Sequence, residues 1–122
     1  MLNLRLYFYF MLMLTGFFIA CEAEDDSNTN CTGVVATYDT TVKSHLNEHC
    51  AISGCHAGPI LANGMDLSTY ASAKAIALAP GSKMICAIEH GSGCVPMPQG
   101  GNKLDASVIK VIKCWVENGA PQ

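Results

Sequence analysis

Two long glycine-rich segments restrict how this chain can fold more than any other feature of its sequence. Residues 54–64 read GCHAGPILANG, and residues 90–102 read HGSGCVPMPQGGN, with four glycines and two prolines in the second. Such segments do not form regular helices or strands. They leave only short stretches for secondary structure in a chain of 122 residues. A domain this small with so much loop needs disulfides, a metal or a bound apolar group to complete its core.

The segments between these loops have helical patterns, and no alternating strand pattern competes with them. We expect four helices, over about residues 40–50, 69–78, 83–90 and 105–118. Their expected N-terminal signals are Asp39 or Thr40, the run 66–69, Ser82, and Asp105 or Leu104. The last helix has the clearest pattern, because apolar residues recur at helical spacing from Val108 to Val116 before Gly119. The sequence therefore predicts an all-α domain of about four short helices joined by long loops.

The first twenty residues, MLNLRLYFYFMLMLTGFFIA, form a separate segment. One charged residue, Arg5, precedes an apolar run that is too short and too poorly flanked to span a membrane, so we interpret residues 1–20 as a signal peptide. The sequence Phe-Ile-Ala-Cys at its end resembles a bacterial lipobox, which predicts cleavage before Cys21 and lipidation of its thiol. Ordinary secretion with cleavage near Ala20 or Ala23 is the alternative. Both interpretations export the protein.

The charge distribution of the mature chain indicates a tether followed by a domain. Four of the ten acidic residues lie at positions 22, 24, 25 and 26, and the other six balance six lysines. We therefore interpret residues 21–33 as a lipidated cysteine with a flexible acidic tether and residues 34–122 as the folded domain. The acidic run also resembles the surface-export signal of some Bacteroidetes lipoproteins. We expect a lipid anchor at the periplasmic face or the cell surface of a Gram-negative bacterium, and, since no basic patch exists, no nucleic-acid partner.

Export also predicts that most of the seven cysteines are bonded, because free thiols do not persist outside the cytoplasm. If Cys21 carries lipid and Cys50 and Cys55 hold a bound group, four cysteines remain, and four cysteines allow three pairings. We favour a Cys86–Cys94 disulfide, whose cysteines are eight residues apart around Gly91 and Gly93. This leaves Cys31 to pair with Cys114, which would connect the start of the domain to its last helix.

The stretch Cys50-Ala-Ile-Ser-Gly-Cys55-His56 is the strongest chemical motif of the chain. Haem c is attached to proteins through C-x-x-C-H, in which two thiols bond the porphyrin and the histidine binds the iron. Four residues separate the cysteines here, and a regular helix would hold them about 140° apart instead of about 60°. The insert must therefore bulge, and Ser53-Gly54 suits a bulge because glycine accepts unusual backbone conformations. C-x4-C-H is a minor variant of haem attachment, so we expect covalent haem c with His56 as the proximal iron ligand.

Met97 is the candidate for the second iron ligand. It lies forty-one residues after His56 in the run Val-Pro-Met-Pro, where the flanking prolines would hold the thioether in place. Paired histidine and methionine ligands raise the haem potential. Gap filling in the core, the usual role of methionine, fits Met84 and Met65 better. His90 is the alternative axial ligand.

The chain resembles the small single-haem cytochrome c-like domains of exported Bacteroidetes and planctomycete proteins. The matching pieces are HCAISGCHAG, GMDLSTYASAKA, and the spaced set Ile88, Gly91, Met97-Pro98, Gly100-Gly101, Lys103-Leu104, Ile109, Ile112, Trp115 and Gly119-Ala120. The resemblance implies a class I cytochrome c fold around one haem c, bound through Cys50 and Cys55 with His56 proximal and Met97 distal. It also implies that the first and last helices cross. The four-residue cysteine spacing and the extra cysteines depart from the family pattern.

These residues predict an electron carrier and not an enzyme, because an iron with both axial positions filled has no open site for a substrate. Its expected partners are a redox donor and a redox acceptor protein near the membrane. If Met97 does not bind the iron, the alternative is a five-coordinate haem that senses or reacts with a diatomic gas or peroxide. Two further alternatives are a lipoprotein interaction module held by disulfides alone, and a zinc site made by Cys50, Cys55 and His56 with His49 or His45.

Overall fold

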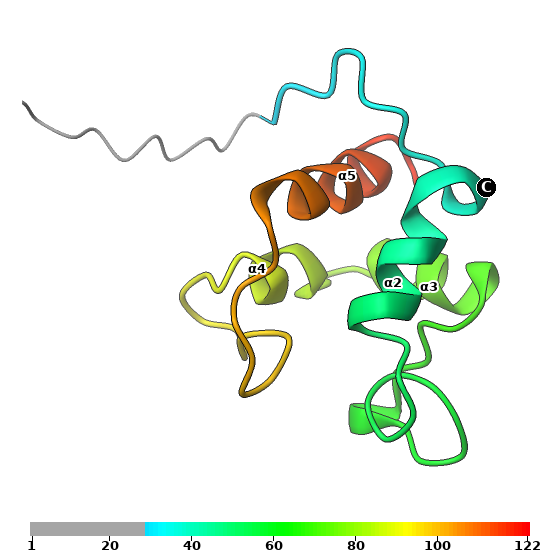
Figure 1. The fold of residues 1–122 in the computed structure, drawn as a ribbon, viewed down its shortest axis with the longest axis vertical. Helices are drawn as coiled ribbons and strands as arrows, with labels where there is room; N and C mark the ends of the chain where they lie inside the picture. The colour runs from blue at the N-terminus through cyan, green and yellow to red at the C-terminus, as the bar shows by residue number, and fades with distance from the viewer. Residues whose placement is uncertain (1–28) are drawn as a thin grey trace, which may run out of the picture.

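A computed structural model describes residues 29–122 of the chain (Figure 1). In chain order its helical elements are η1 (Tyr38–Val42), α2 (Lys43–His49), η2 (Ala62–Gly64), α3 (Tyr70–Ala77), α4 (Met84–Ile88) and α5 (Ala106–Glu117). The described residues contain no β-strand, and one isolated parallel bridge joins Ser53 to Ala57. The all-α class is therefore confirmed, and four of these elements are the expected α-helices. The short 3-10 turn η2 was not predicted.

The first helical segment begins earlier than the sequence indicated. Its N-cap is Thr37, so Asp39 and Thr40, the expected caps, lie inside the first turn. That turn is a π-helix in which the backbone N–H of Val42 donates to the carbonyl of Thr37 at 3.1 Å. The helix then continues as α2, whose end at His49 agrees with the prediction. The Thr37 side chain makes no capping hydrogen bond to the helix.

The starts of the next helices follow the capping chemistry of the sequence in part. Thr69 is the N-cap of α3, and its hydroxyl accepts a hydrogen bond from the Ser72 backbone N–H at 3.3 Å. The N-cap of α4 is Lys83, one residue after the expected Ser82, and it makes no capping hydrogen bond, although the Ser82 hydroxyl accepts from the Met84 N–H at 3.3 Å. Asp105 is the N-cap of α5 without a side-chain hydrogen bond. A side-chain cap thus sets one of these three boundaries.

The core is built where η1, α2 and α5 meet. Its fully buried side chains are Trp115, Leu46, Ile112, Val42 and Cys114. Tyr38 of η1 stands between two other rings, 5.3 Å from Tyr70 and 6.2 Å from Trp115 between ring centroids. These tilted pairs bury large apolar area at the junction of the first and last helices.

Backbone carbonyls near the C-terminus complete this core. The Pro121 carbonyl accepts hydrogen bonds from the Tyr38 backbone N–H at 3.0 Å and from the Trp115 indole at 2.8 Å. The Tyr70 hydroxyl donates to the Ala120 carbonyl at 3.0 Å. The remaining polar atom of the cluster, the Tyr38 hydroxyl, donates to the Ser68 carbonyl at 3.4 Å, so each ring is buried with its polar atom paired.

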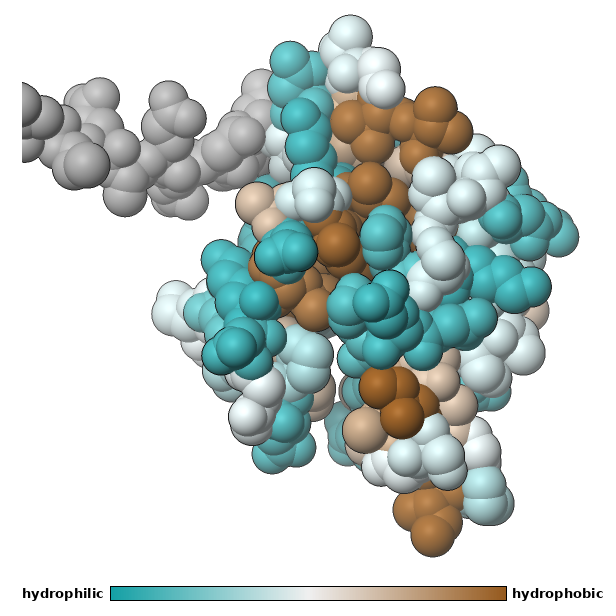
Figure 2. All heavy atoms as spheres, viewed as in Figure 1, coloured by the Kyte–Doolittle hydropathy of each residue, from teal (hydrophilic) through white to brown (hydrophobic). Residues whose placement is uncertain are grey.

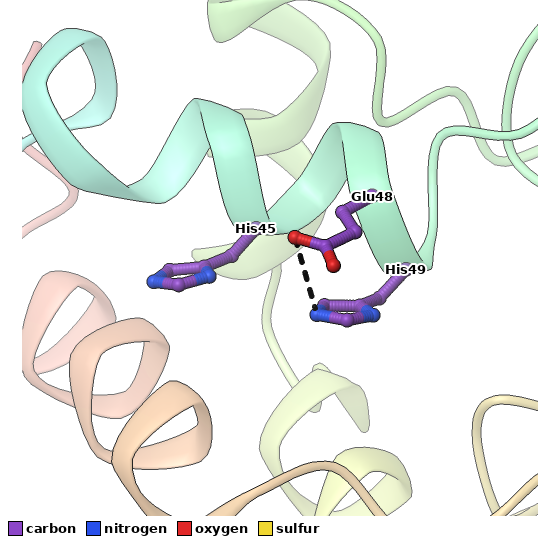
Figure 3. A group of neighbouring side chains, drawn as sticks. All are labelled: His45, Glu48 and His49. Carbon is purple, nitrogen blue, oxygen red and sulfur yellow. Dashed lines mark ion pairs between the residues drawn. The ribbon is translucent and has the colours of Figure 1, made fainter.

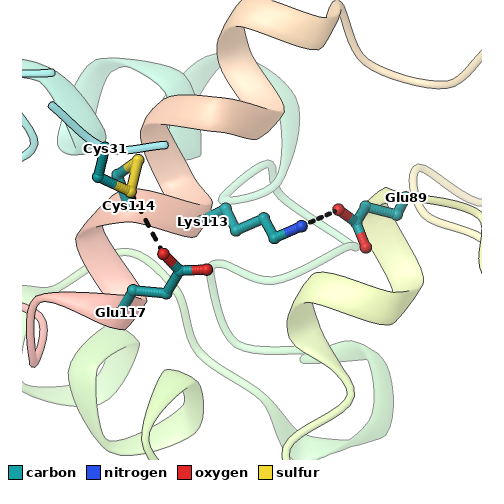
Figure 4. A network of polar contacts seen from close by, with 5 residues as sticks. All are labelled: Cys31, Glu89, Lys113, Cys114 and Glu117. Carbon is teal, nitrogen blue, oxygen red and sulfur yellow. Dashed lines mark hydrogen bonds and ion pairs between the residues drawn. A yellow bond between two sulfur atoms is a disulfide. The ribbon is translucent and has the colours of Figure 1, made fainter. Parts of the chain in front are cut away.

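Both disulfides that the sequence favoured are present. Cys31 is bonded to Cys114 of α5 and Cys86 of α4 to Cys94, with sequence separations of 83 and 8 residues. Figure 4 shows the first disulfide beside an ion pair that joins α5 to the end of α4, in which Lys113 Nζ lies 2.9 Å from Glu89 Oε1. Small loop-rich domains depend on such cross-links.

The predicted signal peptide (residues 1–20), the lipidation site Cys21 and most of the predicted tether lie outside the described residues. The tether prediction ran to residue 33, and Cys31 within it is held on α5 by its disulfide. Within residues 29–122, no helix combines the length and the apolar character that crossing a membrane requires.

Candidate functional site

The segment from Cys50 to His56 leaves the end of α2 in a compact bulge. The Cys50 N–H still donates to the Leu46 carbonyl at 2.8 Å, as in a helix, and the His56 N–H donates back to the Cys50 carbonyl at 3.2 Å. In a regular helix this carbonyl would bond the residue four positions on, whereas His56 is six positions on. Two residues are therefore looped out, and Gly54 takes the positive φ of 83° that the loop requires. The expected bulge is thus present, and His56 keeps the helix-like link to the first cysteine.

His56 is buried and held in one orientation. Its side chain is 7% exposed, and its Nδ1 lies 3.2 Å from the Met65 carbonyl oxygen. A carbonyl can only accept, so Nδ1 carries the proton of the neutral ring and Nε2 has the free lone pair. Within residues 29–122, Nε2 makes no hydrogen bond. Metal-binding histidines characteristically donate their second ring N–H to a carbonyl in this way.

The backbone on either side fixes the His56 ring further. The Leu67 N–H donates to the His56 carbonyl at 2.9 Å, and the Ala62 N–H donates to the Cys55 carbonyl at 2.6 Å. These bonds tie the loop after the motif back onto it. The partner of His56 is a backbone carbonyl, and no pattern of side chains in the sequence could have predicted it.

Cys50 and Cys55 are free thiols, whereas the other four described cysteines are in disulfides. Cys55 is exposed and Cys50 is partly buried. Burial is the main cause that raises the pKa of the Cys50 thiol from 9.0 to about 11, and the nearby Cys55 adds to the rise. Cys50 is therefore a protonated thiol at neutral pH. Among the described residues, this is the one segment in which two unpaired thiols accompany a histidine with a fixed ring orientation.

Met97 is positioned by α4 through its backbone. Its N–H donates to the Ala87 carbonyl at 2.9 Å, and its carbonyl accepts from Nε2 of His90 at 3.1 Å. The Cys86–Cys94 disulfide holds the same loop three residues before Met97. His90, the alternative ligand, is thus a hydrogen-bond partner of Met97. Met84 packs against the core, as expected for a gap-filling methionine.

The loops that carry His56 and Met97 extend from the same end of the helical part (Figure 1). Each carries exposed apolar side chains: Ile52 is 46%, Ile60 is 75% and Val95 is 58% exposed. Figure 2 shows apolar surface on the lobe that the loop between α2 and α3 forms. Large apolar side chains on loops indicate a surface suited to contact with another apolar group.

A zinc site at the cysteine motif is not assembled. Among residues 29–122, the one group of three potential ligands with neighbouring donor atoms is His45, Glu48 and His49 on α2 (Figure 3). Neither thiol nor His56 belongs to it. From the sequence, His49 or His45 was expected only as a further ligand beside Cys50, Cys55 and His56, and Glu48 was not singled out. Its position three residues after His45 was the available signal.

Comparison with protein-family models, with curated proteins and with solved structures finds no match to this chain.

Proposed function

We propose that this protein is an exported c-type cytochrome that carries single electrons at a membrane, with the fold of a class I cytochrome c. One observation carries the proposal. Cys50 and Cys55 are unpaired thiols beside a buried histidine whose Nδ1 is occupied by a carbonyl, in a chain whose other described cysteines are bonded. An exported chain keeps two adjacent thiols unpaired when they are used for something else.

The residues present fit a haem c. Cys50 and Cys55 would hold it, each by addition of its S–H bond across one vinyl group of the porphyrin, and His56 Nε2 would bind the iron. Met97 would supply a second ligand to the iron. The group itself supplies one-electron chemistry at its iron. The exposed apolar side chains Ile52, Ile60 and Val95 belong to the two loops that would surround it, which supports the fit.

The way the chain holds its two candidate ligands supports electron transfer over catalysis. The His56 ring is fixed by the Met65 carbonyl, and the Met97 backbone is fixed on α4 by Ala87 and His90. A fixed His56 ring and a fixed Met97 backbone would limit the rearrangement that accompanies each electron. With His56 and Met97 both bound to it, the iron would have no position left for a substrate, which is why we propose a carrier and not an enzyme.

The proposed partners are a redox donor and a redox acceptor at the membrane. Lipidation of Cys21 and the acidic segment after it would tether the domain to the membrane at the periplasmic face or the cell surface. A tether lets one small domain visit both partners without release into solution, because it raises their effective concentration.

Attachment is tested on the mature protein by intact mass, together with the absorption spectrum after denaturation. We expect one added haem mass that survives denaturation in the parent protein. Cys50→Ala combined with Cys55→Ala should lose it, and Cys86→Ala combined with Cys94→Ala, the matched control, should keep it. A colourless parent protein without added mass refutes the proposal. Rapid CO binding by the parent protein would favour the five-coordinate sensor instead.

A further inference from the structure

The exposed side of α2 carries a second cluster of potential ligands that the proposed haem does not use. His45 and His49 lie one helical turn apart, with Glu48 between them (Figure 3). All three side chains offer their ligand atoms within 4.8 Å of one another. The two imidazoles are stacked, with ring planes 11° apart and centroids 6.5 Å apart.

Glu48 closes the cluster on one side. Its Oε2 lies 3.8 Å from Nε2 of His49, and its side chain is 70% exposed against 27% for that of His49. An exposed ion pair of this length stabilises a protein very little, so it does not by itself explain the arrangement. Neither imidazole makes a hydrogen bond to any residue in the range 29–122, which leaves ring nitrogens of both available to a ligand.

We propose that His45, Glu48 and His49 bind a divalent transition-metal ion of the zinc class. Tetrahedral zinc with bonds of about 2.1 Å needs ligand atoms about 3.4 Å apart, so small side-chain rotations bring these three atoms into place. The order His-x-x-Glu-His also matches a spacing at which two histidines on one helix hold zinc. Three protein ligands leave the fourth position for water.

The ligand set fixes the class of ion. Imidazole suits zinc, copper and nickel, whereas calcium and magnesium require oxygen ligands and a larger coordination number. Two imidazoles with one carboxylate therefore select a transition metal over the hard cations. The site contains no thiol, and it shares no residue with those proposed to hold haem, although His49 directly precedes Cys50.

Zinc binding to the purified mature protein, followed by isothermal titration calorimetry, tests the site. We expect one zinc ion per chain with micromolar affinity, no binding of magnesium, and reversal by a chelator. His45→Gln and His49→Gln should each weaken zinc binding at least about tenfold, a loss of about 1.4 kcal/mol. Glu48→Gln should weaken it less. Asn47→Ala, an exposed position on the same helix, is the matched control and should leave binding unchanged.

The outcomes separate this site from the cysteine motif. Cys50→Ala combined with Cys55→Ala should leave zinc affinity unchanged. The proposal is wrong if the parent protein does not bind zinc, if both histidine variants bind it as tightly as the parent, or if binding disappears only with the two thiols. Circular dichroism of each variant shows that the helix is retained. Because the two histidines are only partly buried, we expect these variants to fold.

Discussion

The two disulfides should have different roles. Cys31–Cys114 should mainly stabilise the fold, and Cys86–Cys94 should mainly position Met97. Cys31–Cys114 closes a loop with a sequence separation of 83 residues, and Cys86–Cys94 one of only 8. A disulfide restricts the unfolded chain by an entropy that grows with the logarithm of the loop length. On that relation the long loop contributes about 4.5 kcal/mol to the free energy of unfolding and the short loop about 2.5 kcal/mol.

Urea unfolding of two double variants tests this difference. Cys31→Ala with Cys114→Ala should unfold at a lower urea concentration than Cys86→Ala with Cys94→Ala, by about 1–2 M for a difference near 2 kcal/mol. Cys114 is fully buried, so its truncation adds a packing loss in the same direction. Far-ultraviolet circular dichroism at low temperature keeps the weaker variant measurable.

If the proposed haem is present, the short disulfide should matter more to its potential than to stability. This disulfide holds the loop that contains Met97, so its removal should lower the potential of the proposed haem, while the variant without Cys31–Cys114 should retain the parent value. Loop length does not set the stability that each disulfide contributes if the variant without Cys86–Cys94 unfolds at the same or a lower urea concentration than the variant without Cys31–Cys114. The Cys86–Cys94 disulfide does not position Met97 for the proposed haem if both variants keep the same haem potential.

Three further perturbations test the core and the site. Met97→Ala should leave the haem attached, lower its potential and allow CO to bind, and an unchanged spectrum and potential would show that Met97 is not the ligand. Trp115→Ala should cost about 3–5 kcal/mol in urea unfolding because the ring is fully buried, whereas the exposed control Val35→Ala should stay within about 0.5 kcal/mol. In haem-free protein, alkylation of Cys50 at pH 8 should be about tenfold slower than that of an ordinary thiol, because its pKa is raised from 9.0 to about 11 and the stronger nucleophilicity of a more basic thiolate offsets about half of that rise. The Cys50 thiol of the haem-free fold stays protonated up to about pH 11, whereas in the unfolded chain it ionises near pH 9. The free energy of unfolding should therefore be highest below pH 9 and decline as the pH rises through 11. A Cys50→Ala variant should show a flatter decline of the urea midpoint over that range.

The features that were predictable from the sequence were those with a local cause. Apolar spacing located α5, and the Thr69 and Ser82 hydroxyls marked the starts of α3 and α4. The start of the first helix was misplaced, because its π-turn depends on the packing of Tyr38 against Tyr70 and Trp115 and not on a cap. Tertiary contacts of this kind override local capping preference.

The candidate site divides in the same way. The cysteines and His56 were visible because their chemistry depends on residue type and spacing. The contacts that orient them could not be predicted, because they are made by the backbone carbonyls of Met65 and Cys50. The type of side chain at a position does not show what its backbone carbonyl binds. The link between His90 and Met97 was equally hidden, since a hydrogen bond from a ring nitrogen to a backbone oxygen depends on how the loop returns to α4.

If the domain is tethered through its N-terminal side, as proposed, the Cys31–Cys114 bond has a mechanical consequence. A pull on the chain ahead of Cys31 passes through sulfur directly into α5, so the polypeptide between the two cysteines is shielded from the load. Stretching a single molecule from both ends should therefore leave the polypeptide between Cys31 and Cys114 unextended until a reducing agent is added.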